Sequence, residues 1–261
     1  MSSEPAPEST LPYPPLYEGK KFVALSDWDG TITNLDSNDY LTDNYGFGFD
    51  ERRKISEKIL HGEVTFRDGF FEEMVSVSKK GITYEQAKQI LRENISLDPG
   101  FKDFYQFSQA NDIPVIIVSS GMEPTIRAVL SNLLGEHEKD IHVISNDVDL
   151  HPDGTWSVKY RHPSSGFGHD KSQAILPYRR LANPPFTFFF GDGVSDLSAA
   201  RHADMLFVKE KPGGENDLHR FCVKEGIKHV LFHDFKAALT AVESIVKGEK
   251  TAEDWFAIGR V

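Results

Sequence analysis

The sequence predicts an α/β protein with a Rossmann-like, mostly parallel sheet, helices on both faces of that sheet, and a small helical cap inserted near its start. Apolar runs at 22–26, 115–118 and 186–190 have the length and composition of buried strands. Strands that alternate with helical segments are typical of a parallel sheet. Residues 38–97 carry only helical periodicity, which predicts the cap.

The order of the remaining elements follows from the same periodicities. Helices are expected to begin near Lys171 and to span 101–110, 125–134, 217–224 and, as the last element, 235–247. Two more short strands are expected at 204–208 and 229–232. The runs 142–145 and 156–160 flank the turn sequence Pro-Asp-Gly-Thr, which predicts a hairpin beside the site.

The chain is expected to divide into a tail, a core and a cap. Residues 1–20 contain several prolines and no apolar run, so a flexible tail is expected there. The core is expected to comprise 21–37 and 98–261, and the cap 38–97. Within the cap, charged amphipathic segments predict helices at 50–61, 65–79 and 83–94. Such a cap would exclude water and select substrate.

Composition narrows the class of protein. The 261 residues include 29 lysines and arginines against 40 aspartates and glutamates, for a net charge of −11, which argues against a nucleic-acid surface. No apolar stretch is long enough to cross a membrane. The single cysteine, Cys222, excludes an internal disulfide and favours a reducing compartment, so a cytoplasmic or also nuclear location is expected. The oligomeric state is left open.

Two carboxylates follow the first predicted strand and form the strongest chemical signal. Asp27 and Asp29 are separated by one residue, and Gly30 is expected to end the strand there. Ligands collect at the carboxyl ends of strands in open α/β sheets, so a catalytic pair is plausible. Alone, Asp-x-Asp-Gly would more often be a turn or a helix entry.

Three later segments strengthen the interpretation of Asp27 and Asp29 as a catalytic pair. Ser119-Ser120-Gly121 follows the second apolar run, Lys171 stands at a predicted helix start, and Gly191-Asp192-Gly193-Val194-Ser195-Asp196 follows the third run. This ordered set resembles the haloacid dehalogenase-like phosphatases, and the resemblance extends over most of the chain from residue 21. The cap between the first two motifs resembles that of the phosphoserine phosphatase-like branch.

The chemistry of these residues fits phosphoryl transfer, which needs a nucleophile, charge neutralisation and positioning. Asp27 is the expected nucleophile, and Asp29 the expected acid that protonates the leaving oxygen and then deprotonates water. Asp27 and Asp192 carry the oxygen ligands that suit Mg²⁺. The resemblance adds the backbone carbonyl of Asp29 as a metal ligand and places Asp196 near the metal.

Phosphate binding is assigned to four other residues, each of which has an ordinary structural alternative. Lys171 would hold the phosphoryl oxygens by charge and Ser119 by a hydrogen bond. The backbone amides of Ser120 and Gly121 would donate from the start of the next helix. A lysine is more often a solvated surface residue, and a serine here could simply cap that helix.

Only two positions in the sequence bear on substrate specificity. In phosphoserine phosphatases a glutamate follows the nucleophile by nine residues and a cap arginine helps to hold the substrate carboxylate. Asp36 occupies the first position here, and Arg67 is the cap candidate for the second. The structural alternative, a helix-surface residue paired with an acid such as Asp68 or Glu63, is the more common role for such an arginine.

The sequence therefore predicts a magnesium-dependent phosphomonoesterase that acts on a small phosphorylated metabolite through an aspartyl-phosphate intermediate. A phosphotransferase or mutase would use the same nucleophile and a different acceptor. A phospho-accepting receiver module is the non-enzymatic alternative. Asp29 argues against a receiver, because a neighbouring carboxylic acid would speed hydrolysis of the phospho-aspartate.

Overall fold

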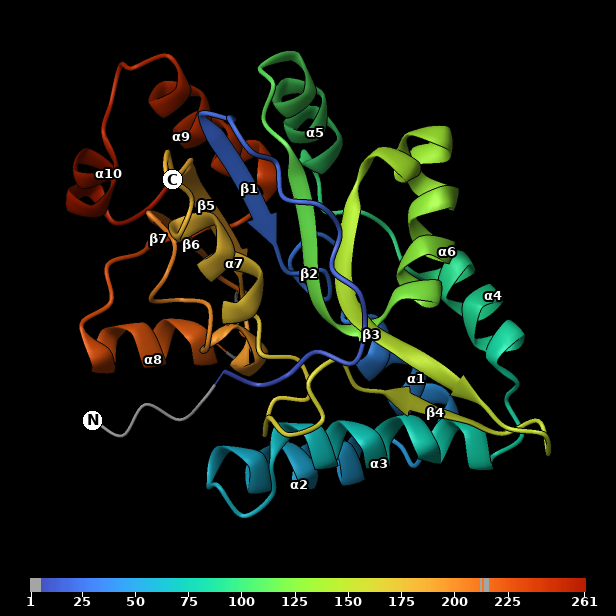
Figure 1. Ribbon diagram of the computed structural model, residues 1–261. Coiled ribbons are helices and arrows are strands. Elements are labelled where there is room, and N and C mark those ends of the chain that lie inside the picture. The colour runs from blue at the N-terminus through green and yellow to red at the C-terminus, as the bar shows by residue number, and fades with distance from the viewer. Residues whose placement is uncertain (1–5, 212, 214–215) are drawn as a thin grey trace.

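The computed structural model describes residues 6–211, 213 and 216–261, and its centre is a seven-stranded sheet with the order β4-β3-β2-β1-β5-β6-β7 (Figure 1). The strands are β1 (Phe22–Ser26), β2 (Val115–Met122), β3 (His142–Leu150), β4 (Trp156–Lys159), β5 (Phe186–Gly191), β6 (Met205–Lys209) and β7 (Val230–Phe232). Every neighbouring pair is parallel except β3 and β4, which form the predicted hairpin. The α/β prediction is confirmed.

The sheet is buried on both faces, and β1 shows why an apolar run predicts this. Successive side chains of a strand point to opposite faces. Phe22 and Ala24 belong to the apolar core on one face, and Val23 and Leu25 to the core on the other. The helices of the catalytic core cover both faces: α5 (Phe101–Ala110), α6 (Glu123–Leu134) and α9 (Phe235–Val246) pack on the first, and α7 (Ser172–Arg179) and α8 (Asp217–Glu225) on the second.

One helix at the end of the chain differs from the prediction. The last expected helix agrees with α9, but the chain continues into α10 (Ala252–Ile258). This short helix begins with a capping box in which Thr251 and Asp254 bond each other's backbone amides. Its one buried residue is Trp255, so there is little apolar periodicity from which to predict it. Short 3₁₀ turns, at Gly135–Asp140 and Val194–Asp196, complete the structure.

The inserted segment contains α1 (Ser37–Tyr45), α2 (Phe49–Leu60), α3 (Phe66–Lys79) and α4 (Tyr84–Asn94). The last three agree with the predicted helices within a few residues. The sequence analysis did not predict α1, because most of its buried side chains are polar: Ser37, Asn38 and Thr42 are buried beside Leu41. A helix with a polar buried face lacks the apolar spacing that signals an amphipathic helix.

The inserted helices lie across the end of the sheet towards which the β1 arrow points, with α4 beside α6 (Figure 1). Their two connections to the core run side by side, since Thr33 forms an antiparallel bridge with Leu97. The β3–β4 hairpin is also attached to the cap: the Trp156 amide donates to Ser78 Oγ at 2.7 Å, and Trp156 Nε1 donates to the Ile82 carbonyl at 2.8 Å. The cap therefore has contacts with the core beyond its connections.

Part of the expected flexible tail makes defined contacts. The Thr10 amide donates to the Arg161 carbonyl at 2.8 Å, and the Arg161 guanidinium donates to the carbonyls of Leu11 and Pro12. Tyr17 stacks on His142 with 4.6 Å between ring centroids. Residues 10–17 are thus held against the core, in contrast to the flexible tail that their composition predicts, and 1–5 lie outside the described residues.

Within the described part of the chain, the helices are all too short or too polar to cross a membrane. Cys222 is buried as a free thiol. The cytoplasmic or nuclear location stays a prediction.

Candidate active site

The predicted carboxylates converge because β1 and β5 are neighbours. Ser26 pairs with Phe190, and the Asp27 amide donates to the Phe190 carbonyl at 2.8 Å. Asp27 and Asp192 therefore leave the same end of adjacent strands. Together with Asp196 they bring carboxylate oxygens within 4.8 Å of one another.

Lys171 lies beneath these carboxylates and is fully buried. Its ammonium group is 2.5 Å from Asp27 Oδ1 and 2.7 Å from Asp196 Oδ1. Burial and the nearby charge of Asp196 hold the pKa of Asp27 well above its usual range, against the effect of Lys171. Burial disfavours the charged ammonium, but Asp196 and Asp27 outweigh burial and raise the pKa of Lys171. The lysine therefore remains a fixed positive charge at the base of the site.

Asp196 fixes the loop that carries Asp192. Its Oδ2 accepts hydrogen bonds from the amides of Asp192 at 3.0 Å and Gly193 at 3.1 Å. Gly191 is needed for this packing, because a Cβ at that position would stand 2.7 Å from the Asp196 carboxyl group. Asp196, which is predicted to lie near the metal, thus also fixes the conformation of the loop that carries Asp192.

Asp29 is held by the start of α1. Its Oδ1 accepts from the Ser37 amide at 2.8 Å and from the Ser37 hydroxyl, and its Oδ2 accepts from Asn38 Nδ2 at 2.7 Å. Burial, followed by the charge of Asp36, raises the pKa of Asp29 to about 7, so both protonation states are accessible near neutral pH. Ser37 and Asn38 were missed in the sequence analysis. Their serine and asparagine side chains at a helix start were the available signal.

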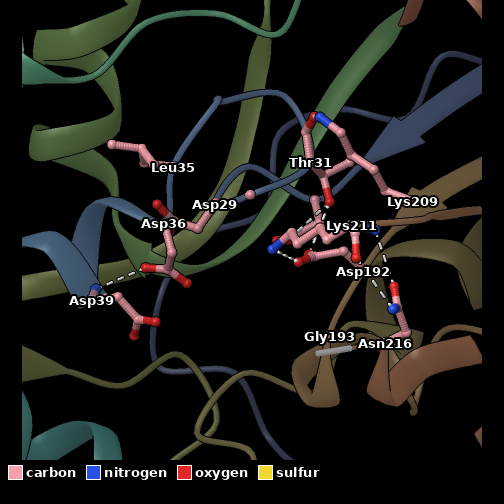
Figure 2. A network of polar contacts seen from close by, with 12 residues as sticks. Asp29, Thr31, Leu35, Asp36, Asp39, Asp192, Gly193, Lys209, Lys211 and Asn216 are labelled. Atoms are coloured by element: carbon pink, nitrogen blue, oxygen red, sulfur yellow. Dashed lines mark hydrogen bonds and ion pairs between the residues drawn. The ribbon is translucent and has the colours of Figure 1, made fainter. Parts of the chain in front are cut away.

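A second buried ion pair supports the loop after Asp29. Lys209 contacts the Asp98 carboxylate and donates to the Thr31 carbonyl at 2.8 Å. The Thr31 hydroxyl donates to Asp192 Oδ1 at 3.0 Å, which joins the first and third motifs (Figure 2). These supporting residues were also missed, because an isolated lysine on a strand carries no specific signal.

The segment predicted to bind phosphate, Ser119-Ser120-Gly121, lies within β2, whereas the sequence predicts that it follows the strand and opens the next helix. Gly121 lies against Asp29, and a Cβ there would be 3.2 Å from Asp29 Oδ2. Ser120 and Gly121 line the pocket, whereas Ser119 is fully buried and its hydroxyl accepts from the Gly121 amide at 2.9 Å. The Ser120 hydroxyl is also buried, and it has no hydrogen-bond partner in the described structure.

The cap supplies the other wall of the pocket, which contains Asp36, Asp39, Arg52 and Glu73. Asp36 is the N-cap of α1, where its Oδ1 accepts from the amides of Asn38 and Asp39, both at 2.9 Å (Figure 2). Arg52 Nη1 lies 2.7 Å from Asp39. Burial, with Asp36 as the next cause, raises the pKa of Glu73 to about 8.

Arg67 lies elsewhere. Its guanidinium group binds Asp68, with Nε 2.8 Å from Oδ1, and donates to the Pro163 carbonyl at 2.7 Å. It is absent from the described lining of the pocket, where Arg52 of α2 is the cap arginine. The structure therefore brings Asp36 to the pocket and directs Arg67 towards the 160–168 loop.

The donor set fits a magnesium ion. Asp27, Asp192 and Asp196 offer clustered oxygen ligands, the type that Mg²⁺ prefers. The Asp29 carboxylate is engaged by α1, which leaves its backbone carbonyl for the role implied by the resemblance. Lys211 contacts Asp192 Oδ2, so this cluster already attracts a positive charge (Figure 2).

Comparisons with known proteins agree with this geometry. A sequence model of haloacid dehalogenase-like hydrolases matches residues 24–201. The Pdp3-interacting factor 1 of Schizosaccharomyces pombe is 45% identical over 219 residues, which are 83% of this chain and 92% of the relative. A polyol phosphate phosphatase of Saccharomyces cerevisiae is 40% identical over 243 residues, 90% of this chain and 98% of the relative. A solved phosphoserine phosphatase from T. onnurineus shares the fold, with a TM-score of 0.58, 20% identity, and coverage of 85% of this chain and 94% of that one.

Proposed function

This chain belongs to the haloacid dehalogenase-like hydrolases as one of their phosphatases, and we propose that it is a magnesium-dependent phosphomonoesterase acting through a phospho-Asp27 intermediate. The observation that carries the proposal is the position of Asp27. Its carboxylate lines the pocket, with Lys171 bound to one oxygen and the Asp192 and Asp196 carboxylates beside it. A nucleophile in this position faces a substrate in the pocket and has a cation behind it.

In the first half-reaction, an Asp27 oxygen forms a bond to phosphorus as the bond between phosphorus and the leaving oxygen breaks. Asp29, across the pocket floor, gives a proton to that leaving oxygen. Lys171 keeps Asp27 oriented and offsets charge on the phosphoryl group. The Ser120 hydroxyl and the Gly121 segment lie where phosphoryl oxygens need donors.

In the second half-reaction, Asp29 takes a proton from water, and the water oxygen attacks phosphorus as the bond to Asp27 breaks. Ser37 and Asn38 hold the Asp29 carboxylate in place for both proton transfers. A bound Mg²⁺, held by Asp27, Asp192 and the Asp29 carbonyl, would neutralise charge on the phosphoryl oxygens.

Polyol phosphates are the substrate class that we propose. The relative that is 40% identical is named a polyol phosphate phosphatase and aligns over nearly its whole length. The cap wall is consistent with such substrates, since it presents carboxylates, and Arg52, the arginine in the described lining, contacts acidic partners through all three of its nitrogens.

Two variants test the mechanism. Wild-type enzyme with Mg²⁺ should release phosphate from a polyol phosphate and from p-nitrophenyl phosphate, and EDTA should stop release. Asp27→Asn should abolish both turnover and covalent labelling, because an amide is a poor nucleophile. Asp29→Asn should accumulate phospho-enzyme with p-nitrophenyl phosphate, visible as an added phosphate in intact-mass spectra of acid-quenched protein. Near-normal turnover by Asp27→Asn would contradict the proposal.

A further inference from the structure

The cap side of the pocket contains a carboxylate that the proposed chemistry does not use. Glu73 of α3 lines the pocket and is 7% exposed. No residue of the described chain forms a hydrogen bond or an ion pair with its carboxylate. A buried carboxylate without partners is costly in free energy, and pockets are places where a ligand supplies the missing partners.

A second unpartnered group lies on another wall of the same pocket. The Ser120 hydroxyl, on β2, is buried without a hydrogen-bond partner in the described structure, and Ser120 is also 7% exposed. Ser120 lies beside Gly121 and Asp29, at the phosphate end, whereas Glu73 lies on the cap. Two walls therefore present polar groups to one ligand, which must carry donors at the end away from its phosphate.

The neighbours of Glu73 determine what kind of donor is accepted. Arg52 donates through Nε and Nη2 to Asp43, at 2.7 and 2.9 Å, and its Nη1 lies 2.7 Å from Asp39. All three guanidinium nitrogens therefore have acidic partners, which leaves Arg52 poorly placed to receive a substrate carboxylate. With Asp36 and Asp39 beside Glu73, this end of the pocket would repel a second anion.

An apolar wall completes this end. Phe66 and Phe70 stack with their centroids 5.9 Å apart, and Ile59 and Leu60 lie beside them in the lining. A polyol chain combines C–H groups that can pack on such a wall with hydroxyl groups that can donate to carboxylates. The combination of acceptors on one side and apolar surface on the other fits a hydroxylated carbon chain.

We propose that Glu73, together with Asp39, binds the hydroxyl groups of the substrate and selects uncharged polyhydroxylated phosphate esters over esters that carry a carboxylate. This inference rests on the proposed function, because the phosphate must sit at Asp27 for the remaining chain to reach Glu73. Glu73 is a specificity-determining residue and takes no part in bond breaking.

The test separates binding of hydroxyl groups from catalysis. Burial raises the pKa of Glu73 to about 8, so the assays are made at pH 8.5, where the carboxylate form predominates. Glu73→Gln keeps the size of the side chain and removes this carboxylate, and Glu72→Gln is the matched control on the exposed side of α3. We expect Glu73→Gln to raise KM for ribitol 5-phosphate by about 10- to 100-fold, the range for loss of one or two charged hydrogen bonds. Turnover of p-nitrophenyl phosphate, which has no hydroxyl chain, should stay within about twofold of wild type. The wild-type preference over 3-phosphoglycerate, which carries a carboxylate, should shrink.

Three outcomes would overturn the inference. Equal losses on ribitol 5-phosphate and p-nitrophenyl phosphate would assign Glu73 a structural role, as would similar losses in Glu72→Gln. A wild-type preference for phosphoethanolamine that Glu73→Gln removes would mean that this end binds a cation. Failure of the wild-type enzyme to release phosphate from any ester would contradict the proposed function instead. Thermal unfolding should change little for Glu73→Gln at pH 7, because a carboxyl group with a pKa of about 8 is mostly protonated there and glutamine is a neutral side chain of similar size.

Discussion

The two ends of the pocket are built differently. At the core end, the buried charges have partners: Lys171 binds Asp27 and Asp196, and Asp29 is held by Ser37 and Asn38. At the cap end, acidic groups outnumber the basic ones in the described lining, and Glu73 has no partner there. The core end is organised without a ligand, and under our proposal the substrate would supply the missing partners at the cap end.

The difference follows from how each end is attached. The core residues follow adjacent strands whose register is fixed by backbone hydrogen bonds, so their spacing changes little. The cap residues lie on helices that reach the core through two short connections and the contacts of the β3–β4 hairpin. Under the proposed function, the chemistry common to all substrates would therefore be located on the sheet, and discrimination among substrates on the cap.

Removing the central cation should give the largest effect and should affect all substrates equally. We expect Lys171→Met to lower turnover of ribitol 5-phosphate and p-nitrophenyl phosphate alike, by at least about 10³-fold. The free energy of unfolding should fall by about 3 kcal/mol, because Asp27 and Asp196 lose a buried partner. Phosphate release and urea unfolding measure the two effects, with exposed Lys102→Met as the control. Turnover within tenfold of wild type would show that the core end does not depend on this charge.

Removing the cap arginine should instead discriminate between substrates. Arg52→Met frees Asp39 and Asp43, so the acidic cap wall loses its organisation. We expect KM for ribitol 5-phosphate to rise about tenfold and the free energy of unfolding to fall by about 2 kcal/mol, with p-nitrophenyl phosphate little affected. Lys58→Met on the exposed side of α2 is the control. Equal losses on both substrates would remove the distinction between the two ends.

The core end could be predicted from sequence, whereas of the cap-side lining only Asp36 was predicted. Asp27, Asp29 and Asp192 follow apolar runs that identify strand ends, and parallel strands bring such ends together. The cap helices α2, α3 and α4 were predicted, but helical periodicity does not say which face meets the active site. Arg52 and Arg67 both lie on predicted helices, and packing alone directs the first to the pocket and the second to the Pro163 carbonyl.

Other contacts also depend on tertiary structure. The helix α1 was not predicted, because its buried face is polar; this face binds the Asp29 carboxylate. The segment from Thr10 to Tyr17 has a composition typical of a flexible tail, yet the Arg161 guanidinium binds its carbonyls. A proline-rich segment presents free carbonyl groups, but nothing in its own sequence identifies the arginine that will bind them.

The contribution of buried His162 to the stability of the core end can be measured through the pH dependence of unfolding. His162 Nδ1 accepts from the Asp170 amide at 3.0 Å, and Nε2 contacts the Tyr13 hydroxyl at 2.8 Å, beside the start of the Lys171 helix. Burial lowers the pKa of His162 to about 4, below the unfolded value of about 6.5. The unfolded chain therefore binds the extra proton first, and His162 contributes a loss of stability as pH falls from 6.5 to 4, at up to about 1.4 kcal/mol per pH unit.

His162→Asn should reduce this contribution, because asparagine can accept from the Asp170 amide without titrating. Urea unfolding at pH 4.5 and 7.5 should give a smaller difference in free energy for His162→Asn than for wild type. His151→Gln, on the exposed hairpin, should leave the difference unchanged. An unaltered difference in His162→Asn would mean that other groups account for the acid sensitivity of this region.

The smallest effect is expected for Arg67, and it tests whether this residue belongs to the cap end of the pocket. Arg67 forms an exposed pair with Asp68, and such pairs contribute about 0–1 kcal/mol. We therefore expect Arg67→Ala to change the free energy of unfolding by less than about 1 kcal/mol and to leave KM within about twofold for both ribitol 5-phosphate and p-nitrophenyl phosphate. Arg52→Met, measured in the same assays, provides the contrast. A selective rise in KM for the polyol phosphate in Arg67→Ala would place this arginine at the substrate, which would require α3 to move relative to the 160–168 loop and release the Pro163 carbonyl.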